Sequence, residues 1–272
     1  MTGNSYRLLA VDIDGTLVNR HGTISDRDKE ALSRARKAGV QVALSTGRGL
    51  QATTGVITEL SLDSYHISFD GALVSHPGSS DEIYASPISK ELVRQMIDTA
   101  HDCGVDLELF TVTHYFVERE TWSTEAHRDF FNTPATIVDF HQVWERERVI
   151  KGGLVSTSPE EASRVTGFCR RLDHQLHFSL AKAPAFPGVD FTNVLSPGVS
   201  KGKALEKLAA HLQVPLGEVI AIGDGTNDIS LLAVAGVAIA MGNAADEVKA
   251  IADYITLDVD HSGLAAALDE YI

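Results

Sequence analysis

Two aspartates follow an apolar run near the beginning of the chain, and their spacing indicates chemistry. Leu8 to Val11 are typical of a buried strand, and Asp12, Asp14 and Gly15 come directly after it. Side chains two positions apart on an extended chain point to the same side, so both carboxylates can face one small volume. Two such charges about 4 Å apart repel each other by roughly 4 kcal/mol at an effective dielectric constant of about 20. The pair therefore indicates a cation site or acid–base chemistry, with an Asp-Gly turn after an edge strand as the alternative.

Polar residues also follow two later apolar segments, and a lysine begins an amphipathic helix between them. In chain order they are Thr46, Gly47 and Arg48 after residues 40–44, Lys201 at the helix start, and Asp224, Asn227 and Asp228 after residues 218–222. The carboxyl ends of parallel strands lie along one edge of an open sheet, where ligands bind. We therefore expect these residues to meet. The set combines acids for a divalent cation, a hydroxyl group, a lysine at a helix N-terminus and flexible glycines that expose backbone N–H groups.

The segments that must position these residues alternate between strand and helix patterns on both sides of a different middle part. Before residue 82, strands are expected at 8–11, 40–44 and 65–69, with helices at 26–38 and 50–60. After residue 195 the expected order is helix 201–212, strand 218–222, helix 229–235, strand 237–241, helix 244–252 and strand 254–256. Such alternation predicts an α/β fold with a doubly wound parallel sheet.

The middle part follows another pattern, in which a helix and two strands occur twice. The expected order is helix 89–103, hairpin strands 106–112 and 115–118, an irregular stretch, strand 151–157, helix 159–172 and strands 176–181 and 189–195. This predicts an inserted α+β domain packed over the first one. We place the core domain at residues 1–81 and 188–272, and the insertion at 82–187.

Composition narrows the classes of partner. The formal net charge of −14 argues against nucleic-acid and anionic-membrane surfaces, because binding to phosphate backbones needs a basic patch. A small phosphorylated metabolite remains compatible, since only the field at its site must be positive. Cys103 and Cys169 are too few for a disulfide scaffold, and no apolar run approaches the roughly 20 residues that span a bilayer. We expect a cytoplasmic protein without membrane contact, and a monomer or homodimer.

Four motifs, in this order, resemble those of the haloacid dehalogenase (HAD) superfamily. They are Asp12-Ile-Asp14-Gly-Thr-Leu, Ser45-Thr46-Gly47-Arg48, Ser200-Lys201-Gly-Lys-Ala-Leu and Gly223-Asp224-Gly-Thr-Asn227-Asp228. The segment from Met241 to Gly263 is similar to the Cof-type phosphatase branch, and the insertion is like that branch's C2-type (C2B-like) cap. The resemblance implies a HAD-like, Rossmannoid core, Mg²⁺ as cofactor, and hydrolysis of a small phosphorylated metabolite, a sugar phosphate or similar phosphomonoester.

The resemblance also assigns roles to residues. It implies that Asp12 attacks phosphorus and becomes an aspartyl phosphate, and that Asp14 protonates the leaving oxygen and then activates water. Thr46 and Lys201 would hold the phosphoryl oxygens. The remaining assignments place Gly47, Arg48 and Asn227 among the substrate-binding residues, and Mg²⁺ on the side chains of Asp12 and Asp224 and the backbone carbonyl of Asp14, with Asn227 and Asp228 completing the metal and lysine surroundings. Arg48 has a second interpretation, pairing with a carboxylate.

One position departs from the branch pattern, which usually shows Asn-Gly-Ala where this chain has Asp70-Gly-Ala. Asp70 either adds a negative charge to the site or is a turn aspartate. In the insertion, His114, Tyr115 and Trp122 are candidates to select the leaving group, as are Lys182 and Phe186 in the segment that returns to the core. Packing or surface positions are the alternative for all five.

Two other functions stay open. A phosphomutase or phosphotransferase would pass the aspartyl phosphate to a sugar hydroxyl instead of water. A non-catalytic metabolite-binding regulator would keep the fold without turnover, although the intact pair of Asp12 and Asp14 argues against it.

Overall fold

A five-stranded parallel sheet forms the centre of the larger of two units. The computed structural model describes residues 6–79, 81–181 and 185–272. In sheet order the strands are β14 (Tyr254–Ile255), β13 (Val237–Ala240), β12 (Val219–Gly223), β1 (Leu8–Val11) and β2 (Gln41–Leu44). All four neighbouring pairs run parallel, which confirms the predicted doubly wound sheet.

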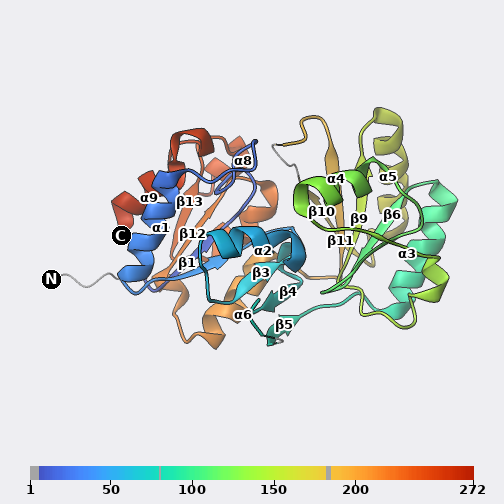
Figure 1. Ribbon diagram of the computed structural model, residues 1–272, viewed down its shortest axis with the longest axis horizontal. Helices are drawn as coiled ribbons and strands as arrows, with labels where there is room; N and C mark the ends of the chain where they lie inside the picture. The colour runs from blue at the N-terminus through green and yellow to red at the C-terminus, as the bar shows by residue number, and fades with distance from the viewer. Residues whose placement is uncertain (1–5, 80, 182–184) are drawn as a thin grey trace.

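Helices cover both faces of this sheet (Figure 1). They are α1 (Asp26–Lys37) and α9 (Gly263–Tyr271) on one face, and α6 (Lys201–His211) and α7 (Ile229–Val234) on the other. Strand β1 shows the division, because Leu9 and Val11 pack with α1 and α9 whereas Leu8 and Ala10 pack with α6 and α7. Every residue of β1 is therefore buried, as in sheets that are covered on both faces.

A small antiparallel sheet extends this unit beside β2. Its strands are β3 (His66–Ser68), β4 (Leu73–Ser75) and β5 (Glu82–Ala85), and helix α2 (Leu50–Glu59) precedes them. A parallel bridge between Ser45 and Ile67 joins it to the main sheet. Between β3 and β4 the chain forms a 3₁₀ turn (Phe69–Gly71), in which Asp70 adopts a left-handed conformation with φ of 52°. The sequence predicted β3 but neither β4 nor β5.

The middle of the chain forms the second unit, on the right in Figure 1. Its strands, in sheet order, are β10 (His177–Ala181), β11 (Asp190–Leu195), β9 (Lys151–Ser156), β6 (Leu107–Phe110), β7 (Tyr115–Val117) and β8 (Thr136–Ile137). The predicted hairpin is present, because β6 and β7 pair antiparallel. Helices α3 (Lys90–Cys103) and α5 (Pro159–Leu172) pack together on this sheet. The repeated helix–strand–strand order is thus confirmed.

Two further helices and four 3₁₀ turns lie outside these layers. They are α4 (Trp122–Phe131), α8 (Asp246–Lys249) and the 3₁₀ turns Phe140–Gln142, Leu216–Glu218, Thr226–Asp228 and Val259–His261. Helix α4 lies in the stretch that we expected to be irregular. Within the described ranges, no helix has both the length and the apolar character needed to cross a membrane.

Strand pairing at the two connections differs from the expected boundaries by a few residues. Strand β5, which begins at Glu82, pairs with β4 of the core, and β11, which begins at Asp190, pairs with β9 and β10 of the insertion. By its pairing, β5 therefore belongs to the core sheet and β11 to the cap sheet. The division into core and cap at residues 82 and 187 stays a prediction, and we use the two names for these units.

Candidate active site

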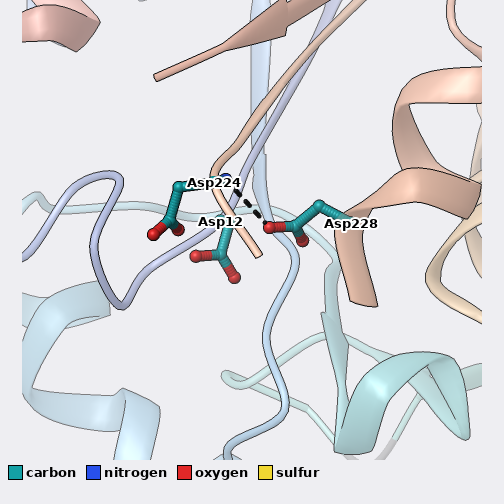
Figure 2. Close-up of side chains that lie close together, drawn as sticks. All are labelled: Asp12, Asp224 and Asp228. Atoms are coloured by element: carbon teal, nitrogen blue, oxygen red, sulfur yellow. Dashed lines mark hydrogen bonds between the residues drawn. The ribbon is translucent and has the colours of Figure 1, made fainter. Parts of the chain in front are cut away.

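Three core strands end at one small volume, as their sequence pattern predicted. Asp12 follows β1, Thr46 follows β2 after one residue, and Asp224 follows β12. Figure 2 shows Asp12, Asp224 and Asp228 converging there, and each offers an oxygen atom within 4.8 Å of the others. The residues that the sequence separates by about two hundred positions therefore meet at the carboxyl edge of the sheet.

A buried lysine balances part of this negative charge. The Nζ atom of Lys201 lies 2.7 Å from Oδ1 of Asp12 and 2.6 Å from Oδ1 of Asp228. Lys201 is the first residue of α6, which begins after Ser200, whose side chain accepts a hydrogen bond from the N–H of Lys203. Burial disfavours its charged form, but the carboxylates of Asp12 and Asp228 outweigh burial and raise the pKa of Lys201.

The acids themselves are crowded. Burial is the main reason that the pKa of Asp12 lies well above its usual value, and repulsion from Asp228 adds to it. Burial, followed by repulsion from Asp228, raises the pKa of Asp224 to about 7, although a hydrogen bond from the Thr16 hydroxyl at 3.1 Å opposes the shift. A divalent cation would offset this repulsion, and carboxylate oxygens are the ligands that Mg²⁺ prefers. Asp12 and Asp224 therefore fit such an ion.

Asp228 is already engaged through both oxygens. Its Oδ1 accepts from Lys201, and its Oδ2 accepts from the N–H groups of Asp224 at 3.1 Å and Gly225 at 3.0 Å. Gly223 leaves the room for this side chain, because a Cβ at that position would lie 2.6 Å from the Cβ of Asp228. These contacts favour a role in holding Lys201 and the loop over direct binding of a metal.

Asp14 acts on Asp224 through its charge and pairs with Arg48. The guanidinium donates two hydrogen bonds, from Nε at 2.8 Å and from Nη2 at 2.5 Å. Of the two interpretations of Arg48, pairing with a carboxylate is the one that the structure contains. The side chain of Asp14 remains 24% exposed at the cavity, so it is accessible to a ligand.

Glycine at position 15 is needed for this arrangement. Gly15 has a φ of 87°, and a Cβ there would lie 2.3 Å from Oδ2 of Asp224. Asn243 supports the same acid from the other side, since its Nδ2 donates to Oδ2 of Asp224 at 3.1 Å and to the carbonyl of Gly15 at 2.8 Å. The turn after β1 and the loop after β12 are thus tied together.

The remaining predicted residues face other partners. Thr46 is buried, and its hydroxyl accepts the N–H of Arg48 at 3.1 Å. The carbonyl of Gly47 accepts a hydrogen bond from Lys151 of the cap at 3.1 Å. The amide of Asn227 donates to Oδ1 of Asp70 at 2.9 Å.

Asp70 is buried beside the site and is therefore more than a surface turn residue. Its Oδ2 accepts from Asn193 of the cap at 2.5 Å. Asn193 and Lys151 are residues that sequence reasoning missed, because no motif surrounds them. The available signal was a single lysine in the apolar start of β9 and a single asparagine in β11, since polar side chains inside strands are seldom buried without a partner.

A cavity of about 460 Å³ lies between core and cap above these residues. Its lining includes Asp12, Asp14, Thr46, Gly47, Arg48, Asp224 and Asn227 from the core, and Phe110, His114, Tyr115, His127, Lys151 and Asn193 from the cap. Of the residues expected to select the leaving group, His114 and Tyr115 line it. Trp122 and Phe186 are absent from the described lining and contact each other edge to face, and Lys182 lies outside the described residues.

The fold and this set of residues define a HAD-type hydrolase. The family model for haloacid dehalogenase-like hydrolases matches residues 9–268, so the chain belongs to that family. The putative phosphatase YxeH of Bacillus subtilis is 28% identical over 98% of both chains.

Solved structures agree with this assignment. The phosphatase BT1666 from Bacteroides thetaiotaomicron superposes with a TM-score of 0.82 and 27% identity, covering 100% of this chain and 97% of its own. The HAD subclass IIB sugar phosphatase BT4131 gives 0.81 and 28%, covering 97% and 98%. The predicted superfamily and fold are therefore confirmed, and the chain is a HAD-family phosphatase.

Proposed function

We propose that this chain is a cytoplasmic, Mg²⁺-dependent phosphatase that hydrolyses a sugar phosphate or similar small phosphomonoester through an aspartyl phosphate on Asp12. The observation that carries the proposal is the position of Asp12 under the cavity, 2.7 Å from the buried ammonium of Lys201 and grouped with Asp224 and Asp228. The sugar phosphatase among the structural neighbours supports the substrate class.

In the first step, a carboxylate oxygen of Asp12 forms a bond to phosphorus while the bond from phosphorus to the leaving oxygen breaks. Lys201 keeps Asp12 oriented and, with Thr46, holds the phosphoryl oxygens. Asp14 delivers its proton to the leaving oxygen. In the second step, Asp14 takes a proton from the water that attacks the aspartyl phosphate, and phosphate is released.

In the structure the Asp14 carboxylate pairs with Arg48, so it must part from the guanidinium before it can face the leaving oxygen. A bound phosphomonoester supplies an alternative anion for Arg48. We therefore assign Arg48 to substrate binding, with Gly47 beside it offering backbone contacts at the same loop. Substrate entry would thus release the Asp14 side chain from Arg48.

Mg²⁺ would be held by the side chains of Asp12 and Asp224 and by the backbone carbonyl of Asp14. Asp228 and Asn227 would stabilise this arrangement indirectly, Asp228 through its contact with Lys201 and Asn227 through its contact with Asp70. When bound, the ion neutralises charge on the acids and on the phosphoryl oxygens. Without it, the acids would repel a substrate that carries nearly two negative charges.

The test is phosphate release from an aryl phosphate with and without Mg²⁺, for the wild type and for Asp12→Asn. Asparagine keeps the size of the side chain and removes the nucleophile, so we expect metal-dependent turnover in the wild type and none in the variant. Asp26→Asn is the matched control, because Asp26 is exposed on α1 and should retain full activity. Equal activity in wild type and Asp12→Asn would rule out Asp12 as the nucleophile.

The same assay separates the alternatives. A phosphomutase or phosphotransferase would release little phosphate until a sugar hydroxyl is supplied as acceptor. A metabolite-binding regulator would bind phosphate esters from a phosphosugar panel without turning any of them over. Turnover to free phosphate with water alone supports the phosphatase.

A further inference from the structure

One buried carboxylate, that of Asp70, joins the cap to the core at the active site. Its Oδ2 accepts from the amide of Asn193 at 2.5 Å, and its Oδ1 accepts from the amide of Asn227 at 2.9 Å. Asn193 belongs to cap strand β11, and Asn227 belongs to the core loop that carries Asp224. Asp70 is 2% exposed, so these contacts replace its contacts with water.

The cap continues this chain of contacts to a buried ammonium group. Lys151 donates to Oδ1 of Asn193 at 2.9 Å and to the carbonyl of Gly47 at 3.1 Å, and its Nζ lies 4.8 Å from the ring centre of Phe110. Burial lowers the pKa of Lys151, and the charge of Asp70 acts in the opposite direction. The ammonium of Lys151 in the cap and the carboxylate of Asp70 in the core are thus both hydrogen-bonded to the side-chain amide of Asn193.

The directions of these hydrogen bonds suit a carboxylate at position 70. A carboxylate only accepts, and here it meets two amide donors. An asparagine would offer one acceptor, and its own N–H₂ would face the amide of Asn193 or Asn227. Rotating Asn193 would not relieve this, because its N–H₂ would then face the ammonium of Lys151. Rotating Asn227 would turn its oxygen toward the new N–H₂, which reverses the hydrogen bond to the core loop.

We propose that Asp70 is a positioning residue that couples the seated cap to the reaction centre, by joining Asn193 and Lys151 of the cap to Asn227 and Gly47 beside the phosphate site. The inference rests on the proposed phosphatase function. With the cap seated, the segment 46–48 and the loop 224–228 are held at the same time as bulk water is excluded. With the cap displaced, Asp70 loses Asn193, and Gly47 loses Lys151.

The test is a charge exchange between two positions. In Asp70→Asn the hydrogen bond to Asn227 is lost or reversed and the negative charge near Lys151 is removed, so kcat should fall on the order of 10- to 100-fold, the range for a lost hydrogen bond to a charged group. KM should change little, since Thr46 and Lys201 are unaltered. In the double variant Asp70→Asn/Asn193→Asp, the carboxylate introduced at position 193 can accept from both Lys151 and the new amide at position 70, and the oxygen of that amide can accept from Asn227. We expect the double variant to recover at least about half of the loss on a logarithmic scale.

Asp28→Asn is the matched control. Asp28 is also a buried carboxylate that accepts two hydrogen bonds, from the Ser25 hydroxyl at 2.7 Å and the N–H of Ala265 at 2.8 Å, but it lies between α1 and α9 away from the cavity. We expect this substitution to reduce the free energy of unfolding and to leave kcat unchanged. Loss of kcat specific to Asp70→Asn then reflects position, and not the removal of any buried carboxylate.

Urea unfolding of the wild type, Asp70→Asn, Asn193→Asp and the double variant gives a second readout, the free energy of unfolding. Coupling between positions 70 and 193 in both kcat and the free energy of unfolding supports the proposal. It is overturned if Asp70→Asn keeps the wild-type kcat, if the folded double variant is no faster than Asp70→Asn, or if the coupling occurs in unfolding alone. A wild type that releases no phosphate would instead contradict the proposed function, while the unfolding data would still report the contact.

Discussion

At the scale of single residues, the site depends on opposite charges placed in a volume that water does not reach. Lys201 is 1% exposed and contacts two carboxylates, so removing it leaves Asp12 and Asp228 buried without a cation. Breaking a buried ion pair from one side costs about 3–5 kcal/mol. Protonation of the acids, or a bound metal, would reduce that cost.

We therefore expect Lys201→Met to lower the free energy of unfolding by up to about 3 kcal/mol at neutral pH and to abolish phosphate release. Added Mg²⁺ should recover part of the stability and none of the activity. Urea unfolding with and without Mg²⁺, beside the phosphate assay, measures both. Unchanged stability in the metal-free variant would show that the ammonium does not compensate the two acids.

His66, which lies away from the candidate site, has a pKa in a range that unfolding experiments can cover. His66 in β3 is buried, its Nδ1 accepts the N–H of Leu44 at 3.1 Å, and burial lowers its pKa from 6.5 to about 4. The unfolded chain therefore binds a proton that the folded chain excludes. Stability is fully present above pH 6.5 and falls as the pH approaches 4, by about 3 kcal/mol from this group.

His66→Asn keeps an acceptor for Leu44 and cannot be protonated, so its free energy of unfolding should fall less steeply than that of the wild type between pH 6.5 and 4. Urea unfolding at several pH values tests this. The exposed His21→Asn is the control and should follow the wild type. Parallel curves for wild type and His66→Asn would contradict the assignment.

The sequence predicted the site residues that stand in motifs and missed those that do not. The predicted residues lie where a strand ends or a helix begins, and local patterns in the sequence reveal these positions. They are Asp12, Thr46, Lys201 and Asp224. Lys151 and Asn193 act on residues more than 100 positions away, so only the fold reveals their partners.

At the scale of elements, the strands and helices with strong local signals match the prediction within a few residues. Helix α1 begins after Ser25, as expected, because its side chain accepts the N–H of Asp28. Helix α4 was missed because its capping box pairs Thr121 with Thr124, whereas the usual signature has Glu or Gln at the second position. Strands β4 and β5 are short, and they form by antiparallel pairing of β4 with β3 on one side and with β5 on the other.

Close packing between two helices gives the prediction at this scale. In α6, a Cβ at Gly202 would lie 2.1 Å from the carbonyl oxygen of Ser230 in α7, so Gly202→Ala must push the helices apart. We expect a loss of about 1–3 kcal/mol in the free energy of unfolding, and lower activity because Lys201 is adjacent. The control is Gly55→Ala in α2, where nothing lies within 4 Å.

Gly55→Ala should be stabilising by roughly 0.5–1 kcal/mol, because alanine favours a helix over glycine and meets no obstacle. Thermal or urea unfolding of the two variants compares them directly. If both substitutions shift stability in the same direction, the separation of α6 and α7 does not limit the residue at position 202.

At the scale of the whole molecule, core and cap meet along more than one contact. Phe69 and Leu73 of the core pack with Phe110, Tyr115 and Leu195 at the junction. The side chain of Gln51 in α2 also donates to the carbonyl of Thr113 in the cap hairpin. The cavity is therefore bounded by both units. Sequence patterns are local, so they indicated the two units but could not establish which cap residues face the acids.

The group of three acids makes metal binding a property of the folded molecule. Asp12 and Asp224 come from segments about two hundred positions apart, so a cation that binds both stabilises the folded state alone, by about 2.7 kcal/mol at 100 times its dissociation constant. We expect Mg²⁺ to raise the midpoint of thermal unfolding in the wild type, and to do so much less in Asp224→Asn.

The effect should depend on pH in a definite direction. The pKa of Asp224 without metal is about 7, so at pH 6 this carboxylate is largely protonated and must lose its proton before it binds a cation. The Mg²⁺-induced rise in the midpoint should therefore be larger at pH 8 than at pH 6. Asp26→Asn should behave as the wild type at both values, since Asp26 is exposed on α1. An equal rise in Asp224→Asn, or a larger rise at pH 6, would show that Mg²⁺ binds elsewhere on this acidic chain.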